Sequence, residues 1–267
     1  MALPSAARQK AARETLKALF AYPATVYAVH YACQSLKAQG PLASARVGAI
    51  AVRQLSTGQV TPFSIADVAE RNRLGIDEIA PNLDLIERRV LEGFFEFVRM
   101  NRQARFIHWN MRDNQFGFGA LEHRLIVLSG APETVPEINR IDLARLMEDL
   151  YGADYATGRG KLEAIAGLNS MISSGYRTGA AEAAAMEAGA FRDVANSTQA
   201  KVRIIADVAS GAFDRTLKTE AGLLTQHAGP VRLMLQAMAE NPAYTLVSGM
   251  IGGFVVMIKI WDYVTGG

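Results

Sequence analysis

A short strand that runs directly into a helix, between Arg105 and Arg124, constrains the fold of this chain more than any other stretch. Phe106 and Ile107 are typical of a buried strand, and polar residues crowd its carboxyl end. From Gln115 onward, apolar residues recur at helical spacing, at Phe118, Leu121, Leu125 and Leu128. Open α/β sheets hold ligands at the carboxyl ends of strands, where helices begin. The stretch therefore predicts an α/β fold with a candidate site directly after Ile107.

Three segments rich in β-branched and apolar residues precede this stretch, at 24–33, 46–55 and 60–65. The turn Ser56-Thr57-Gly58 between the second and third segments is typical of a hairpin. We therefore expect a three-stranded meander, preceded by an amphipathic helix over 5–20. A long helix over 77–100, capped by Asp77, is expected to join the meander to the strand at Phe106.

The chain after residue 130 is predicted to be helical apart from a loop over 130–139 that contains two prolines. Helices are expected over 141–150, 161–168, 180–191 and 198–219, with a very short extended piece before the first. The resulting organisation is an N-terminal helix at 1–23, an α/β domain at 24–195 and a helical linker at 196–242. A membrane segment at 243–264 follows.

The membrane prediction is based on an uncharged run over 243–258. This run is shorter than the about 20 apolar residues of a typical spanning helix. Aromatic residues bracket it as they do at bilayer interfaces, and Lys259 can extend to the headgroups. We therefore expect a C-terminal anchor, with the rest of the chain in the cytoplasm, and keep a buried core helix as the alternative. The small residues Gly249 and Gly253 predict self-association of the anchor into a homo-oligomer.

The overall charge and the cysteine content narrow the class of protein. The formal net charge is +2 over 267 residues, so any contact with nucleic acid has to come from a local basic surface. Cys33 is the single cysteine, so no intramolecular disulfide can form.

The polar residues after Ile107 are the candidate site. His108 could act as a general base, Trp109 could stack on a nucleic-acid base, and Asn110 and Arg112 could bind a ligand. Asp113 could hold a metal ion. Each has a structural alternative: a hydrogen-bonded histidine, a packed tryptophan, or an aspartate that caps the next helix. For Arg112, as for the later Arg124, the alternative is a salt bridge to Glu122 or Asp113.

The order of these elements resembles the DEDD-type 3′–5′ exonucleases of the ribonuclease H-like superfamily. Residues 106–113 with the following helix are similar to the family's Asn followed shortly by an Asp. Segment 140–144 resembles the segment that follows this motif, and segment 161–166 resembles the helix before the final acidic motif, so the resemblance covers residues 24–195. The chain also resembles uncharacterised bacterial proteins with the same H-W-N-M-R-D core. The resemblance implies a ribonuclease H-like mixed sheet with flanking helices.

The resemblance also implies a pair of Mg²⁺ or Mn²⁺ ions held by four carboxylates. The first strand should supply an Asp-x-Glu pair, but the matching place reads Ala32-Cys33-Gln34. Gln34 can hydrogen-bond a ligand but brings no charge. The acids that remain are Asp113, Asp142 and Glu182. Two ions would be poorly neutralised by this set, so we expect metal-dependent hydrolysis to be lost or strongly reduced.

Three hypotheses follow. The first is a membrane-anchored, degenerate exonuclease-like domain that binds single-stranded nucleic acid or a nucleotide with little or no cleavage. Its candidate residues are His108, Asn110, Arg112, Asp113 and Glu182. The second is an active metal-dependent 3′–5′ exonuclease with a rearranged acidic site formed by Asp113, Asp142 and Glu182. The third is a non-catalytic signalling or scaffold module at the membrane, which predicts a closed, side-chain-filled cleft over 108–113.

Overall fold

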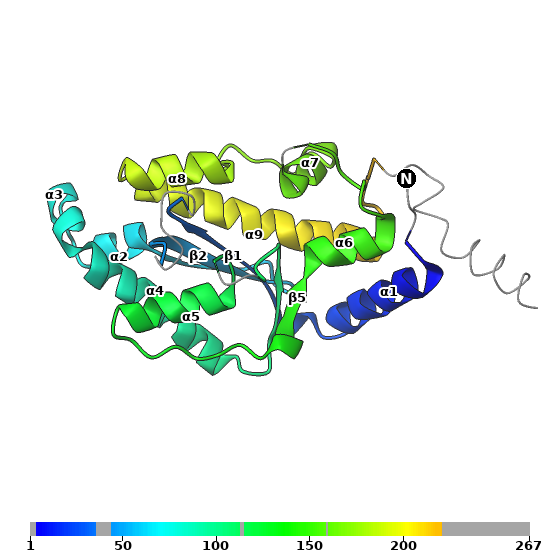
Figure 1. Cartoon of the computed structure of the whole chain (residues 1–267), viewed down its shortest axis with the longest axis horizontal. Helices are drawn as coiled ribbons and strands as arrows, with labels where there is room; N and C mark the ends of the chain where they lie inside the picture. The colour runs from blue at the N-terminus through cyan, green and yellow to red at the C-terminus, as the bar shows by residue number, and fades with distance from the viewer. Residues whose placement is uncertain (1–3, 36–43, 113–114, 159, 221–267) are drawn as a thin grey trace, which may run out of the picture.

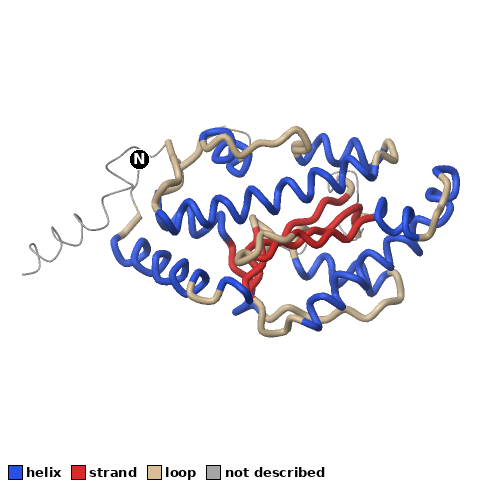
Figure 2. The backbone as a smooth tube through the Cα atoms, turned by 180° about the vertical axis from the view of Figure 1, so that it is seen from behind, coloured by secondary structure: helices blue, strands red, loops and turns tan. Residues whose placement is uncertain are grey.

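Five strands form one mixed sheet in this computed structural model, which describes residues 4–35, 44–112, 115–158 and 160–220 (Figures 1 and 2). The strands lie in the order β3-β2-β1-β4-β5. Their bounds are Val26–Cys33 (β1), Val47–Gln54 (β2), Val60–Ser64 (β3), Arg105–His108 (β4) and Arg140–Asp142 (β5). Strands β1, β2 and β3 pair antiparallel, whereas β4 is parallel to β1 and β5 is parallel to β4. The α/β class and the expected meander are both confirmed.

Helices cover both faces of the sheet (Figure 1). Figure 1 shows α6 to α9 on one side of it and α4 and α5 on the other. The helices are α1 Ala6–Phe20, α2 Ile65–Arg71, α3 Ile76–Ile79, α4 Leu83–Met100, α5 Phe118–Val127, α6 Leu143–Tyr151, α7 Lys161–Leu168, α8 Gly179–Glu187 and α9 Phe191–Asp214. The helices expected over 5–20 and 161–168 are confirmed to within a residue at each end.

Successive residues of the central strands enter two separate hydrophobic cores. Ala28 and Ile107 belong to a cluster with residues of α1, α6, α7 and α9. Val29 and Phe106 belong to a second cluster, which contains the buried faces of α4 and α5. This alternation follows from the pleat of a strand, which directs neighbouring side chains to opposite faces. Burial on both faces explains why these strands read as continuous apolar runs in the sequence.

The prediction of one continuous helix over 77–100 is wrong, because the helix is interrupted. The chain forms a short helix α3, a 3₁₀ turn over Ala80–Asn82, and then α4 from Leu83. Pro81 lies in that turn, and proline cannot donate the backbone hydrogen bond that a continuous helix requires. Helix α2 was not expected at all. It begins where the Ser64 hydroxyl accepts a hydrogen bond from the Asp67 backbone N–H at 3.0 Å, as a helix N-cap does.

The second half of the chain differs more from expectation. The extended piece before residue 141 is a paired strand, β5, so the sheet gains a fifth member. Helix α8 ends at Glu187, and Gly189 at φ +72° separates it from α9. Helix α9 crosses the expected boundary between residues 195 and 196 and packs on β1 and β2. Residues 196–214 therefore belong to the folded domain and do not form a linker. Helix α1 belongs to it too, since it packs on α6 and α9.

The predicted membrane segment at 243–264 lies outside the described residues. Across the described part of the chain, none of the helices combines the length and the apolar character needed to cross a bilayer.

Candidate functional site

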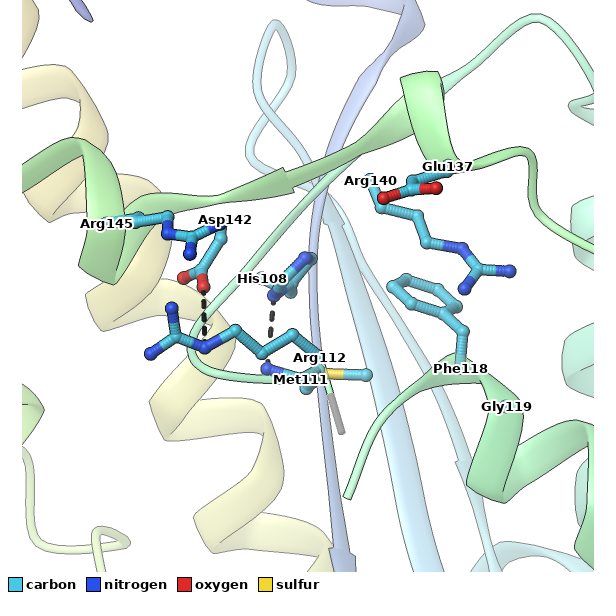
Figure 3. Close-up of a pocket in the computed structure, with 9 residues that line it drawn as sticks. All are labelled: His108, Met111, Arg112, Phe118, Gly119, Glu137, Arg140, Asp142 and Arg145. Atoms are coloured by element: carbon cyan, nitrogen blue, oxygen red, sulfur yellow. Dashed lines mark hydrogen bonds and ion pairs between the residues drawn. The ribbon is translucent and has the colours of Figure 1, made fainter. Parts of the chain in front are cut away.

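A pocket of about 220 Å³ lies at the carboxyl ends of the parallel strands β4 and β5 (Figure 3). The last residues of these strands, His108 and Asp142, are register partners in the sheet. The pocket is lined by His108, Met111, Arg112, Phe118, Gly119, Glu137, Arg140, Asp142 and Arg145. The sequence predicted a site after Ile107 because open α/β sheets hold ligands at the carboxyl ends of strands, where helices begin. The pocket lies where two such strands end.

Asp142 connects the two strand ends. It is the N-cap of α6, and its Oδ1 accepts hydrogen bonds from the backbone N–H groups of Ala144 at 3.1 Å and Asn110 at 3.3 Å. Its Oδ2 lies 3.4 Å from Nε of Arg112, as Figure 3 shows. The carboxylate therefore holds the turn after β4 and partly neutralises one arginine of the pocket.

His108 is a neutral hydrogen-bond donor. Its side chain is only 3% exposed, and its Nδ1 accepts a hydrogen bond from the backbone N–H of Met111 at 3.2 Å. Burial lowers the pKa of His108 to about 4; the charge of Asp142 opposes this shift, and those of Arg140 and Arg112 reinforce it. With Nδ1 accepting, the single ring proton resides on Nε2. A buried, hydrogen-bonded histidine is the structural alternative that the sequence left open.

Three arginines give the pocket its charge, against the carboxylates of Asp142 and Glu137. Arg112 has 47% of its side chain exposed beside Asp142. Arg140 donates from Nε to the Val135 carbonyl at 2.7 Å and lies over the Phe118 ring. Arg145 is exposed and makes no hydrogen bond or ion pair with any residue that the structure describes. Arg112 and Arg140 are each paired with a carboxylate, Asp142 and Glu122 respectively, whereas Arg145 can bind a ligand without losing a partner.

The turn between β4 and the pocket is fixed by its own polar groups. Asn110 adopts a left-handed conformation at φ +55°, which asparagine tolerates better than most residues. Its Oδ1 accepts a hydrogen bond from Nη2 of Arg112 at 2.9 Å. Trp109 points the other way: it is 7% exposed and packs edge-on against Tyr155 with ring centroids 6.5 Å apart. Trp109 is thus a core residue in this structure, which agrees with the alternative of a packed tryptophan and not with stacking on a nucleic-acid base.

Other residues expected at the site lie elsewhere. Glu182, on α8, is buried and pairs with Nζ of Lys201 from α9 at 2.5 Å. Burial raises the pKa of Glu182, although Lys201 opposes the shift. Gln34 follows β1, and its backbone N–H donates to the Arg46 carbonyl at 2.9 Å. Asp113 lies outside the described residues. The structure therefore brings His108, Asn110, Arg112 and Asp142 together, and Glu182 does not line their pocket.

In the described part of the chain neither Arg112 nor Arg124 pairs with Glu122, and Asp113, the other expected partner, lies outside the described residues. Arg124 pairs with the buried Glu87, at 2.6 Å between Nη2 and Oε2, and does not line the pocket. Arg112 pairs with Asp142, and Glu122 pairs with Arg140. Arg124 is therefore a structural residue and not a candidate phosphate contact.

The carboxylates in the described part of the chain do not fit a two-metal centre. No three His, Cys, Asp or Glu side chains of that part come together as metal ligands would. Asp142 and Glu182 each face a cation of the protein, Arg112 and Lys201 respectively. Two closely spaced divalent ions need several carboxylates whose charge is not already compensated in this way.

Arg145, like Glu137 and Arg140, is a charged residue of the pocket that was not predicted from the sequence. It is the third residue of α6, after the N-cap Asp142. The positive end of the helix dipole disfavours a cation in this first turn, where acidic residues are usual, and here there are none. A basic residue at such a position, next to a strand end, was the signal available in the sequence.

Comparisons with family models, with curated proteins and with solved structures found no match to this chain.

Proposed function

We propose that this chain is a ribonuclease H-like domain that binds phosphate groups of single-stranded nucleic acid or of a nucleotide, with little or no cleavage. The binding site is the pocket at the ends of β4 and β5. The observation that carries the proposal is Arg145, an exposed arginine with no partner among the described residues, beside Arg112 and Arg140. A C-terminal anchor over 243–264 would hold the domain at the cytoplasmic face of a membrane.

The arrangement of the strands supports the ribonuclease H-like assignment. The succession of a three-stranded meander, helices, a parallel strand and a further helix is the one on which the sequence resemblance is based. The site lies at the carboxyl ends of β4 and β5, and β4 pairs in parallel with the first half of β1. Function does not follow from fold alone, so the ligand has to be inferred from the residues that line the pocket.

Arginine and a neutral histidine are suited to phosphate. The planar guanidinium group donates paired hydrogen bonds to phosphate oxygens and stays charged at any physiological pH. Nε2–H of His108 adds a neutral donor from the base of the pocket. At about 220 Å³ the pocket is smaller than most whole-ligand sites, which measure about 300–1,000 Å³. It therefore fits a phosphate group, with the rest of the nucleotide lying outside.

The same residues argue against efficient hydrolysis. His108, with its low pKa and its Nδ1 bound to a backbone N–H, offers no acceptor for the proton of an attacking water. Asp142 is held by two backbone N–H groups and faces Arg112. An active exonuclease with a rearranged acidic site therefore gains no support from the described residues. A pocket lined by Arg112 also speaks against the scaffold hypothesis, which predicted a closed cleft.

Binding of oligonucleotides to matched arginine variants tests the proposal. The full-length protein is titrated into labelled single-stranded oligonucleotides and into mononucleotides at low salt, and fluorescence anisotropy is recorded with and without Mg²⁺. Arg145→Ala should weaken binding about tenfold, as expected for the loss of about 1.4 kcal/mol from a charged contact. Arg105→Ala is the control, since Arg105 is also exposed but lies at the opposite end of β4.

Two results would overturn the proposal. One is the absence of binding to every oligonucleotide and nucleotide. The other is an equal loss of affinity in Arg105→Ala and Arg145→Ala, which would mean a diffuse charge effect and no site at the pocket. Mg²⁺- or Mn²⁺-dependent digestion that Asp142→Ala abolishes would replace the proposal with the active-exonuclease hypothesis.

A further inference from the structure

A second pocket, of about 430 Å³, lies beside β3, the outer strand on the opposite side of the sheet from β5. It is formed by the edge strand β3 and by helices α2 and α4, whereas the first pocket lies at β4 and β5. From its charge and its lining we infer that this pocket binds a small organic anion, a carboxylate or a phosphate monoester that carries an apolar ring or chain. The inference is independent of the nucleic-acid site proposed above.

The polar side of this pocket is cationic. Arg71 and Arg89 line it, and none of the described residues that line it is acidic. Nη1 of Arg89 donates to Oδ1 of Asn72 at 2.8 Å, and Nδ2 of Asn72 donates to the Val68 carbonyl at 2.6 Å. Nε of Arg71 donates to the Asp67 carbonyl at 3.2 Å. Both arginines are thus oriented by uncharged groups, so their positive charge is not compensated by these contacts.

Each guanidinium group keeps donors for a ligand. Nε and Nη2 of Arg89, and both terminal nitrogens of Arg71, make no hydrogen bond or ion pair with the described residues. An arginine held in place by one bond loses less conformational entropy when it binds an oxyanion. Two such arginines at one pocket select a carboxylate or a phosphate over a neutral or cationic group.

The rest of the pocket is apolar. Phe63 and Val90 form part of its lining, and the Phe63 ring is held edge-on by Phe94 and Phe97, at 6.0 Å from each centroid. Gly93 of α4 also lines it, and a Cβ there would lie 3.3 Å from Cδ1 of Phe63. A glycine inside this 18-residue helix costs about 1 kcal/mol relative to alanine and leaves room beside the ring. The ligand therefore needs an apolar part that can pack on Phe63.

A peptide strand added to the edge of β3 fits this surface less well. Pro62 lies in the middle of β3 and has no backbone N–H, so it interrupts the row of donors that strand addition requires. A volume of about 430 Å³ lies within the range of sites for small molecules. The pocket thus favours a compact ligand over an extended chain.

Four small probes test charge and ring separately. Phenyl phosphate and benzoate carry both features, inorganic phosphate carries only the charge, and benzyl alcohol carries only the ring. Isothermal titration and ligand-detected saturation-transfer NMR with the full-length protein should show phenyl phosphate or benzoate binding at least tenfold more tightly than both comparators. The stronger of the two tells whether the natural ligand is a phosphate or a carboxylate.

Arginine variants locate the binding. Arg89→Ala and Arg71→Ala should each weaken the aromatic anion about tenfold, and both residues are exposed, so the fold should not change. Arg88→Ala is the matched control, because Arg88 is the next residue on α4 and pairs with Glu92. The inference fails if neither aromatic anion exceeds both comparators, or if Arg89→Ala and Arg71→Ala bind as well as Arg88→Ala. A loss of affinity in Arg145→Ala, with none in Arg89→Ala, would assign the binding to the first pocket.

Discussion

At the scale of single residues, burial and charge partners decide what each candidate side chain can do. His108 and Trp109 are adjacent in the sequence, yet one lines the pocket and the other packs against Tyr155. Arg112 and Arg145 both reach the pocket, but Arg112 already faces Asp142. Of these two arginines, Arg145 is therefore the one whose removal should weaken the binding of an anionic ligand more and lower the stability of the fold less.

His108 predicts a dependence of stability on pH. Its pKa is about 4 in the folded protein and 6.5 for the free side chain, so the unfolded chain binds the proton more tightly between these values. The free energy of unfolding should therefore fall as the pH falls from about 6.5 towards 4. His108→Asn keeps an acceptor for the Met111 N–H and removes the titration. It should reduce the loss between pH 7 and pH 5 by on the order of 1–2 kcal/mol.

Urea unfolding at several pH values measures this effect. His123→Asn is the control, since it replaces a histidine that is exposed on α5 and does not line the pocket. His30 remains in every variant, and its pKa is also lowered, mainly by burial, so some loss of stability in acid persists. Identical pH profiles for His108→Asn and the unmodified protein would show that His108 titrates normally in the fold.

At the scale of elements, one buried carboxylate ties a helix of one face to the sheet and to its neighbouring helix. Glu87 of α4 accepts hydrogen bonds from the Val47 backbone N–H of β2 at 2.7 Å and from Nε of Arg124 of α5 at 2.8 Å. Arg46 approaches its other oxygen at 3.1 Å. A carboxylate buried with this many donors is satisfied, and its removal leaves Arg124 with the longer ion pair to Asp84 at 3.8 Å.

Glu87→Ala should therefore lower the free energy of unfolding by about 3–5 kcal/mol, the usual cost of breaking a buried ion pair from one side. Glu92→Ala on the same helix removes only an exposed pair with Arg88 and should cost less than about 1 kcal/mol. Denaturant unfolding of both variants checks the difference. Equal, small losses would mean that the helices and the sheet hold together without this contact.

At the scale of the whole molecule, arginine-lined pockets lie beside both outer strands of the sheet, β5 and β3. The helices from α1 to α9 form one packed domain around the sheet (Figure 2). The predicted anchor over 243–264 lies beyond the described residues and stays a prediction. Such an anchor would confine the domain to the membrane surface, where it would search for its ligand.

Fractionation of cell lysates tests the anchor. The full-length protein should sediment with membranes, and a variant that ends before Ala243 should stay in the soluble fraction. Gly249→Leu combined with Gly253→Leu should reduce cross-linking between copies, because bulky residues prevent close approach of two helices. Full-length protein in the soluble fraction without detergent would refute the anchor. Unchanged cross-linking would refute only the self-association.

The sequence by itself determined the parts of this protein that depend on local patterns. Apolar periodicity and turn residues were enough to place the meander, most helices and the edge of the sheet at which the first pocket opens. These features follow from interactions between residues a few positions apart, which a single sequence displays directly. Pro81 and Gly189, which interrupt two of the expected helices, are local signals as well, and the expected helices ran across them.

The tertiary structure alone decided which charges meet. Glu87 and Arg124 are far apart in the sequence, as are Glu182 and Lys201, and both pairs are buried by the packing of helices on the sheet. Asp142 caps α6 through a local contact, but it meets the Asn110 N–H and Arg112 because β5 lies beside β4. Arg145 becomes a pocket residue for the same reason. Partner choice depends on distances set by the whole fold, and no local pattern in the chain encodes them.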